Sequence, residues 1–470
     1  MPVNAYDALV PETPAGRPCL LLDGGDVWSY ADLDDRSAAL AGALHRRGVV
    51  AGDRVVVQVP KSADAAALYL ACLRRGVVPI PLNTAYTPVE VAGFVDDARP
   101  ALVVDQPLLD ELAADDEPLA ELVPRAGTDP AAMLYTSGTT GRSKGALLSV
   151  RNLVSNARAL IDAWRFEPGD VLVHVLPTFH VHGLFVALHC ALGVGAAVRF
   201  HTRFDPDAVV ADLGRSTVLM GVPTHYHRLL AHPGLDAAAC AGMRLFTSGS
   251  APLPAAEHEA FAERTGHRIV ERYGMTETMI LTSNPYDGDR VAGTVGFPLP
   301  SVELRVVDDE GGRCAPGTAG GVEVRGPGVF LGYWERPEAT AAAFAPDGWF
   351  RTGDVGHVDG QGRLTLAGRA SDLIIAGGYN VYPKEVELVL DALPEVAESA
   401  VVGVPDADLG EVVVAVVVPA PGATVEADAV VAACGDLARF KRPRRVVVVD
   451  ELPRNAMGKV QKAALRAALG

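Results

Sequence analysis

The chain has 470 residues, 49% of them hydrophobic, and a formal net charge of −17. This length is sufficient for two or three domains with ample cores, as in an ordinary globular enzyme. The acidic balance argues against non-specific binding to nucleic acid and against binding to anionic membrane surfaces.

Cysteine usage and the absence of long apolar runs favour a cytoplasmic protein. The six cysteines are widely spaced and include no CxxC pair, so we expect neither a structural zinc site nor a disulfide framework. Such thiols suit a reducing compartment. The N-terminus lacks a basic segment followed by an apolar run, and no apolar run approaches twenty residues, so we expect no signal peptide and no membrane span.

Residues 28–110 alternate between helix and strand patterns. The apolar spacing predicts helices over 30–47, 65–75 and 87–97, and strands over 54–60, 77–82 and 101–105. This alternation predicts parallel strands covered by helices.

Residues 135–145 form a polar loop between two apolar runs, a pattern typical of strand, loop and strand. The loop holds Lys144 together with hydroxyl and glycine residues: Thr136, Ser137, Gly138, Thr139 and Thr140. Glycine lets backbone N–H groups face an anion, while hydroxyls add donors and lysine adds charge, so we predict a polyphosphate site. The loop is not a P-loop, because Ser143 stands where that motif needs its second glycine. The alternative is a solvated, Ser/Thr-rich hairpin.

The strand and helix rhythm then repeats. Strands are predicted at 171–175, 197–200, 217–222, 244–247 and 268–272. Polar clusters follow four of these strands, at 176–183, 221–226, 248–253 and 271–278. Ligands bind at the carboxyl ends of parallel strands, so we expect the clusters to line one cleft.

The pattern changes twice in the last third of the chain. From about residue 291, short strands and Gly/Pro/Asp turns predict an antiparallel sheet or a small β-barrel. From residue 369 a hairpin, helices and strands predict an independent α+β unit of about a hundred residues. The predicted fold is α/β: an N-terminal domain over 1–368, with parallel sheets between helices and a β-rich subdomain at 291–368, and a smaller C-terminal domain over 369–470.

Glu277 is a candidate Mg²⁺ ligand. It follows a strand end next to the predicted polyphosphate site, where a carboxylate would be repelled unless a divalent cation lay between them. Mg²⁺ binds few protein carboxylates and several phosphate oxygens. The alternative is a solvated glutamate.

Four further side chains have open interpretations. Asp354 follows a Gly turn and can accept both hydroxyls of a ribose, or can simply cap the turn. Lys459, near the C-terminus, is solvent-exposed unless its domain closes over the cleft, where its charge would stabilise a developing anion. His180 and His182 lack a third ligand in register, so we expect an aromatic gate or a substrate contact rather than a metal site.

Taken together, the motifs resemble the adenylate-forming superfamily of acyl-CoA synthetases, free-standing adenylation domains and firefly-type luciferases. The resemblance covers nearly the whole chain and rests on motifs in the family order: YTSGTTGRSKG, PTFHVHG, SGSAPL, RYGMTET, WFRTGD, GRASDLIIAGGYNVYPKEVE and PRNAMGK. It implies two half-reactions. A carboxylate attacks the α-phosphate of ATP, and then a thiol, that of coenzyme A, displaces AMP after the mobile C-terminal domain has rotated.

The resemblance also implies roles for individual residues. Residues 136–144 would hold the β- and γ-phosphates of ATP, and Glu277 would hold Mg²⁺. The other implied sites are adenine at Ser250, Ala251, Pro252 and Tyr273, the α-phosphate at Thr276, the ribose at Asp354, the ribose and phosphate edge at Arg369, the adenylation step at Lys459, the pantetheine tunnel at Gly377 and Gly378, and the aromatic gate at His180.

Arg272 suggests which acid is used. Simple fatty-acid activators tend to have a neutral residue at this position, whereas an arginine fork suits a second carboxylate. FHVHG with ERYGMTET looks like malonyl-CoA synthetases, so a small dicarboxylic acid is the expected substrate. His182 and Ser248 would join Arg272, and Val181 and Ile280, both modest in size, would leave room for a C2-methyl group, so methylmalonate is also expected.

Several alternatives remain at this point. Arg272 can instead be satisfied by Glu271 or solvent, in a short-chain, medium-chain or aryl acyl-CoA synthetase. The chain can also be an adenylation module that loads a carrier protein, or a non-catalytic nucleotide-binding relative. One departure from the family concerns the hinge: Ser371, before Asp372, stands where aspartate or lysine is usual, so the electrostatic anchoring of the hinge is in doubt.

Overall fold

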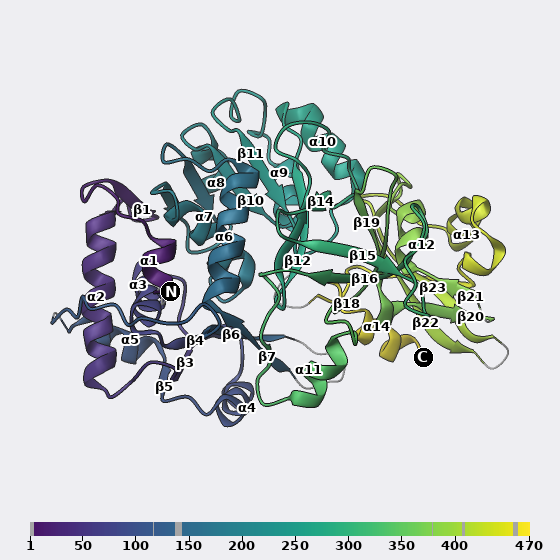
Figure 1. The fold of residues 1–470 in the computed structure, drawn as a ribbon. Helices are drawn as coiled ribbons and strands as arrows, with labels where there is room; N and C mark the ends of the chain where they lie inside the picture. The colour runs from purple at the N-terminus through teal and green to yellow at the C-terminus, as the bar shows by residue number, and fades with distance from the viewer. Residues whose placement is uncertain (1–3, 116, 137–142, 378, 407–408, 455–458) are drawn as a thin grey trace.

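Nine strands form the central sheet of the computed structural model, which describes residues 4–115, 117–136, 143–377, 379–406, 409–454 and 459–470 (Figure 1). The middle strands run parallel and the edges are antiparallel. In spatial order they are β14 (Phe297–Pro298), β13 (Met279–Ser283), β12 (Val270–Met275), β11 (Leu245–Ser248), β10 (Val218–Gly221), β8 (Val171–His174), β9 (Ala197–Phe200), β1 (Pro18–Leu22) and β2 (Val27–Ser29). The carboxyl ends of β12, β11, β10 and β8 therefore meet at one edge, as predicted.

Alternate residues of the parallel strands enter two different hydrophobic cores. On β10, Val218 and Met220 belong to one core and Leu219 to the other, as expected of a strand buried on both faces. The first core includes α6 (Val150–Trp164), the π-helix η1 (His182–Leu188) and α7 (His189–Leu192). The second includes α8 (Pro206–Leu213), α9 (Pro223–Ala231) and α10 (Ala255–Thr265).

A smaller parallel sheet confirms the alternation predicted for residues 28–110. Its strands, in the order β4 (Val78–Pro81), β3 (Arg54–Val57) and β5 (Leu102–Val104), are joined by helices. The helices of this region are α1 (Ala5–Leu9), α2 (Tyr30–Arg46), α3 (Ala63–Arg75), α4 (Pro88–Ala98) and α5 (Gln106–Ala113). Ser29 and Thr87 begin α2 and α4 with capping boxes, in which the side chain satisfies an N–H group that the first turn leaves unpaired.

The predicted strand, loop and strand around the polar loop are β6 (Pro130–Thr136) and β7 (Lys144–Ser149), which pair antiparallel. A late segment, β17 (Gly332–Tyr333), adds to the other edge of β7, and α11 (Pro337–Ala343) follows it. The β-rich region is an antiparallel sheet in the order β15 (Glu303–Val307), β16 (Gly320–Arg325), β18 (Phe350–Val358) and β19 (Leu364–Arg369).

The residues after β19 form a sheet and cores of their own. The strands are β20 (Ile374–Ala376), β21 (Tyr379–Val381), β22 (Val396–Asp406), β23 (Gly410–Pro419) and β24 (Arg445–Val448); the helices are η2 (Ala370–Asp372), α12 (Pro383–Leu390), α13 (Ala427–Ala433), η3 (Cys434–Asp436), η4 (Arg439–Lys441) and α14 (Lys462–Leu469). Ser371 lies in the short turn η2, and Asp372 pairs with Arg466 at 3.0 Å. A domain boundary at 368/369 and a hinge at Ser371–Asp372 remain predictions.

Two details differ from the sequence pattern. Strand β12 continues past Arg272 to Met275 because β13 pairs with it, and Gly274 permits this pairing: a Cβ there would lie 2.0 Å from the Met279 carbonyl oxygen. The end of the PTFHVHG motif, from His182 on, begins a π-helix, a form that often marks functional sites. Among the described residues, no helix is both long and apolar enough to span a membrane.

Candidate active site

The polar clusters that follow β8, β11 and β12 contact one another at the sheet edge. Ser250, just after β11, lies 3.4 Å from His182 through its Oγ and the Nδ1 of the imidazole. Arg272 on β12 packs against Gly249, where a Cβ would lie 2.4 Å from the guanidinium Cζ. Glycine is therefore required at 249 for the arginine to occupy this position.

Asp354 on β18 is the centre of the predicted nucleotide pocket. Its carboxylate, 6% exposed, accepts a hydrogen bond from the Tyr273 hydroxyl and pairs with Arg369 Nε at 2.8 Å. The β18–β19 register, which opposes Asp354 to Arg369, brings the two charges together. Desolvation raises the pKa of Asp354 although the charge of Arg369 opposes this shift. The structure thus brings Tyr273, Asp354 and Arg369 together, and their predicted roles toward adenine, ribose and the phosphate edge stay predictions.

The residues predicted for Mg²⁺ and for the polyphosphate are connected through Tyr333. Glu277, 6% exposed, accepts a hydrogen bond from the Tyr333 hydroxyl at its Oε1, at 2.9 Å. Lys144 Nζ lies 5.0 Å from the centroid of the Tyr333 ring. Thr136, at the end of β6, contacts the Lys144 carbonyl through its Oγ1 at 3.4 Å. The predicted ligands Ser137, Gly138, Thr139 and Thr140 lie outside the described residues.

The chemistry of Glu277 fits a magnesium ion. Tyr333 uses Oε1, and Oε2 has no hydrogen-bond partner in the part of the chain that the structure describes. The described residues hold no group of three or more His, Cys, Asp or Glu side chains suited to a metal. One carboxylate oxygen beside a polyphosphate site matches the way Mg²⁺ is bound, with substrate phosphates and water completing the shell.

Lys459, close to the C-terminus, lies within electrostatic range of the whole site. Desolvation, then the positive charges of Arg369 and Arg272, lower its pKa to about 8, against the opposite effect of Asp354 and Glu277. Desolvation, and then the charge of Lys459, lower the pKa of His180 to about 4. Lys459 is therefore half-buried near the charges of Asp354 and Arg369, and its catalytic role stays a prediction.

Arg272 is a buried cation that forms no ion pair with any carboxylate in the described part of the chain. It is 5% exposed, and its Nε and Nη2 have no hydrogen-bond partner among the described residues. Desolvation lowers the pKa of its guanidinium to about 10. Glu271 does not satisfy it, because the Glu271 carboxylate accepts from His258 at 3.1 Å and from the Gly293 amide at 3.1 Å. Neither Glu271 nor solvent, the two alternatives open at the sequence level, accounts for this side chain.

Further unpaired polar atoms lie close to Arg272. In the described part of the chain, His182 Nε2 and Ser248 Oγ are buried without a partner, and these residues are 5% and 1% exposed. Val181 is half-buried next to His182. Ile280, 2% exposed, lies on β13, which packs against η1.

The remaining predicted residues have different environments. Thr276 is half-buried in the turn between β12 and β13, and Ser250 adopts a positive φ of 71° in the turn after β11. Ala251 is half-buried there and Pro252 is exposed. Gly377 is exposed in the β20–β21 hairpin, which Figure 1 shows far from β12, so this arrangement does not bring it to the site. Gly378 lies outside the described residues.

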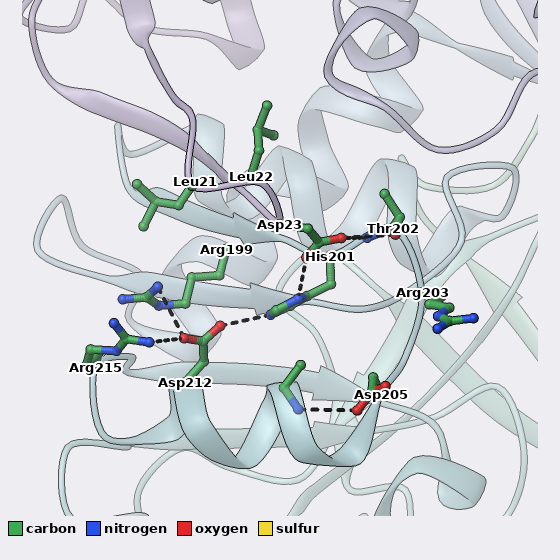
Figure 2. Close-up of a pocket in the computed structure, with 12 residues that line it drawn as sticks. Leu21, Leu22, Asp23, Arg199, His201, Thr202, Arg203, Asp205, Asp212 and Arg215 are labelled. Atoms are coloured by element: carbon green, nitrogen blue, oxygen red, sulfur yellow. Dashed lines mark hydrogen bonds and ion pairs between the residues drawn. The ribbon is translucent and has the colours of Figure 1, made fainter.

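A separate polar pocket of about 560 Å³ lies at the ends of β1 and β9 (Figure 2). Its buried His201 lies between two carboxylates, with Nδ1 2.7 Å from Asp23 and Nε2 3.0 Å from Asp212. Arg199 and Arg215 both pair with Asp212. These charges neutralise one another and join the β1 turn to α8, which is a structural role, unlike the unpaired Arg272.

Sequence reasoning did not identify Tyr333. The residue follows a glycine in a segment without a recognised motif, and only its pairing with β7, about 190 residues earlier, brings it to Glu277 and Lys144. The sequence did contain a signal that Glu271 does not satisfy Arg272. Neighbouring residues on a strand point to opposite faces, so the two side chains are separated.

Comparisons with known proteins agree with this geometry. Residues 8–334 match the family model of the AMP-binding enzymes, and residues 385–459 match that of the AMP-binding enzyme C-terminal domain. The sequence is 37% identical to indoleacetate–CoA ligase of Aromatoleum aromaticum (93% of this chain, 92% of the relative) and 36% identical to a mitochondrial malonate–CoA ligase of Mus musculus (96% and 88%). Among solved structures, ATP-bound MatB from Rhodopseudomonas palustris superposes with a TM-score of 0.96 at 47% identity, covering 100% of this chain and 99% of that one.

Proposed function

Because the chain belongs to the AMP-binding enzyme family and is an AMP-forming acid–thiol ligase that uses ATP, Mg²⁺ and CoA, we propose that its acid is malonate. In the first half-reaction a malonate carboxylate oxygen attacks the α-phosphorus of ATP, giving malonyl adenylate and pyrophosphate. In the second, the CoA thiol attacks the acyl carbon, giving malonyl-CoA and AMP. Methylmalonate would react in the same way.

The observation that supports a dicarboxylic acid is the buried, unpaired guanidinium of Arg272. An unpaired charge away from water is costly, and a carboxylate is the group that best satisfies a guanidinium fork. The reacting carboxylate must face the nucleotide, so a second carboxylate on the same acid would reach Arg272. A small diacid supplies both groups.

Two neighbouring groups would complete the recognition of the distal carboxylate. His182, whose Nδ1 contacts Ser250, has its Nε2 available. The hydroxyl of Ser248 is buried and without a partner among the described residues. The modest size of Val181 and Ile280 would accommodate a methyl group on the central carbon.

The nucleotide-side residues have matching roles in adenylation. Asp354 and Tyr273 would hold ribose and adenine, and Glu277 would hold the Mg²⁺ ion, which supplies charge neutralisation on the phosphates when bound. Lys144 would contact the β- and γ-phosphates. Lys459 would stabilise the negative charge that develops between the attacking carboxylate and the α-phosphate, a role supported by its electrostatic interaction with Asp354, Glu277 and Arg272.

For the second half-reaction we propose that residues 369–470 rotate about Ser371–Asp372. This motion would withdraw Lys459 and bring the β20–β21 hairpin, with Gly377, to the acyl adenylate as one wall of the pantetheine tunnel. The exposure of Gly377 in the present arrangement is compatible with such a change. We also propose a cytoplasmic location, supported by six cysteines without disulfides.

An aryl acid is the second candidate, because the relatives include indoleacetate–CoA ligase and a feruloyl-CoA synthase of Amycolatopsis at 35% identity. An aryl acid would leave Arg272 without a partner, which is why malonate is preferred.

The deciding experiment measures pyrophosphate release with ATP, Mg²⁺ and CoA for malonate, methylmalonate, acetate, butyrate, indoleacetate and ferulate. We expect malonate to have the highest kcat/KM, with methylmalonate next, and acyl-CoA to be detected by mass. Equal values for acetate and malonate, or a preference for an aryl acid, would refute the diacid proposal. Pyrophosphate release without any acyl-CoA would instead indicate a carrier-protein thiol as acceptor.

A further inference from the structure

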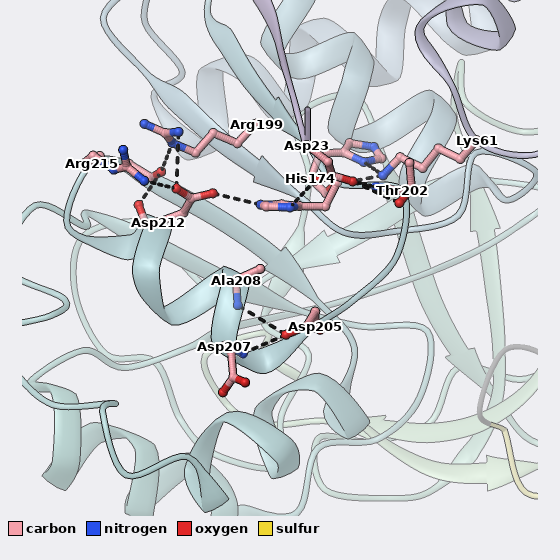
Figure 3. A network of polar contacts seen from close by, with 12 residues as sticks. Asp23, Lys61, His174, Arg199, Thr202, Asp205, Asp207, Ala208, Asp212 and Arg215 are labelled. Atoms are coloured by element: carbon pink, nitrogen blue, oxygen red, sulfur yellow. Dashed lines mark hydrogen bonds and ion pairs between the residues drawn. The ribbon is translucent and has the colours of Figure 1, made fainter. Parts of the chain in front are cut away.

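A half-buried lysine, Lys61, connects the two parallel sheets behind the acid-binding residues. Lys61 lies in the loop between β3 and α3, in the small sheet, and reaches the end of β8 in the central sheet. Figure 3 shows its ammonium directed at the His174 ring. Lys61 Nζ is 2.6 Å from His174 Nδ1, 2.8 Å from the His174 carbonyl oxygen and 4.4 Å from the Phe200 ring centroid. Among the described residues no carboxylate forms an ion pair with this ammonium, and Asp23 acts on it only through its charge.

The hydrogen bonds of the His174 ring determine its tautomer. The other ring nitrogen, Nε2, lies 2.9 Å from the Gly183 carbonyl oxygen. A carbonyl only accepts, so Nε2 carries the hydrogen. Nδ1 is then the acceptor, and Lys61 is the donor to both Nδ1 and the His174 carbonyl. His174 is fully buried, and desolvation and the charge of Lys61 lower its pKa well below the ordinary value, which keeps the ring neutral.

The end of this chain of hydrogen bonds is the segment that carries the acid-binding histidines. Gly183 follows His182 directly and lies in the first turn of the π-helix η1. It is closely packed, since a Cβ at 183 would lie 2.1 Å from the Pro177 carbonyl oxygen. The position of Gly183 therefore determines where His180 and His182 project, and the hydrogen bond from His174 holds that position.

We propose that Lys61 is a positioning residue of the acid-binding site: through His174 and Gly183 it holds the π-helical turn that presents His182 and His180 to the acid. It touches neither the acid nor the nucleotide. The inference depends on the proposed function only in taking these histidines as acid contacts. Its effect should fall on the KM for the acid, because the nucleotide residues Asp354, Tyr273 and Glu277 lie on other elements.

The test compares Lys61→Met with Arg264→Met. Arg264 on α10 is a matched control, because it too is a basic side chain that donates to backbone carbonyls, those of Leu230, His232 and Leu235, but on the other face of the sheet. Both variants should lower the melting temperature. Lys61→Met should also raise the KM for the acid about tenfold, with the KM for ATP within about twofold of wild type. Arg264→Met should change neither KM.

The acid used is the one that the wild-type enzyme prefers in the panel of six acids. If that acid is not a diacid, the proposed function fails, but the Lys61 comparison is still made with the preferred acid, so the two failures are distinguishable. The proposal is overturned if Lys61→Met lowers the melting temperature while leaving the acid KM unchanged, or if the KM for ATP rises as much as that for the acid.

A milder variant covers the case in which Lys61→Met does not fold. The side chain in Lys61→Gln keeps an N–H donor but is too short to reach both acceptors of His174. We expect the KM for the acid to rise by about threefold or more. An unchanged KM for the acid in folded Lys61→Gln would refute the positioning role.

Discussion

Tyr333 donates a hydrogen bond to Glu277 at 2.9 Å, and the same aromatic ring lies 5.0 Å from Lys144 Nζ. One side chain thus orients the carboxylate proposed for Mg²⁺ and the cation proposed for the polyphosphate. The pairing of β17 with β7 fixes it there. Tyr333 therefore positions two residues, Glu277 and Lys144, on which metal and phosphate binding in the proposed reaction depend.

Removing the Tyr333 hydroxyl should weaken the use of Mg²⁺. Tyr333→Phe keeps the ring against Lys144 but leaves Glu277 Oε1 without its donor. Because a hydrogen bond to a charged group contributes about 1.5–3 kcal/mol, kcat/KM for ATP should fall about tenfold or more, with a higher Mg²⁺ concentration for half-maximal rate. Pyrophosphate exchange over a Mg²⁺ titration measures the rate, and calorimetry with MgATP measures binding.

Tyr30→Phe is the control for that variant. Its hydroxyl donates to the Ala196 carbonyl in the buried core, away from the site. It should lower stability without changing the Mg²⁺ requirement. If both variants gave the same Mg²⁺ curve as wild type, Tyr333 would have no role in metal binding.

Replacing Arg272 should separate recognition of the diacid from folding. Losing one partner of a buried charge pair costs about 2–5 kcal/mol, so kcat/KM for malonate should fall about 100-fold or more in Arg272→Ala, with the KM for ATP little changed. The free variant should melt no lower than wild type, because an unpaired buried charge has been removed.

Thermal melting with and without malonate checks the second half of this prediction. Malonate should raise the melting temperature of wild type and leave that of Arg272→Ala unchanged. A strong loss of stability in the free variant would show that Arg272 has a structural partner, and the diacid interpretation would lose its main support.

Gly249→Ala should have the same effect on the acid without altering any charge. The added Cβ would lie 2.4 Å from the Arg272 Cζ, so the guanidinium must move. We expect the ratio of malonate to acetate kcat/KM to fall about tenfold or more. Gly93→Ala is the control: it adds a Cβ within α4, where nothing lies within 4 Å, and should leave the ratio unchanged.

The adenylation rate should fall as pH rises through the pKa of Lys459. Its pKa of about 8 means that the ammonium is the main form at pH 7 and is lost above pH 8. Since the proposed role needs the charged form, kcat/KM for pyrophosphate exchange should be level below the pKa and decline above it. A flat profile between pH 7 and about 9.5 would contradict that role.

Much of the parallel core follows from pattern alone. The strand 197–200 was predicted with the bounds that the structure shows. Strand β10, which is buried on both faces, was predicted because such strands read as continuous apolar runs. The convergence of polar clusters also follows, because parallel strands place their carboxyl ends together.

What the pattern does not contain is long-range pairing. Strand β12 extends to Met275 because β13 returns beside it, and Tyr333 reaches Glu277 through β17. The link from Lys61 to His174 crosses from one sheet to the other, over more than a hundred residues of chain. Local periodicity carries no information about such partners.

The bridge from Lys61 to His174 also bears on how segments can be exchanged between relatives of different acid specificity. A graft limited to residues around 174–183 would arrive without the loop that steadies it, since that loop comes from the first quarter of the chain. Transferring the Lys61 loop together with residues around 174–183 preserves these hydrogen bonds. Transferring only one of the two segments leaves a hydrogen-bond donor or acceptor without its partner in the interior.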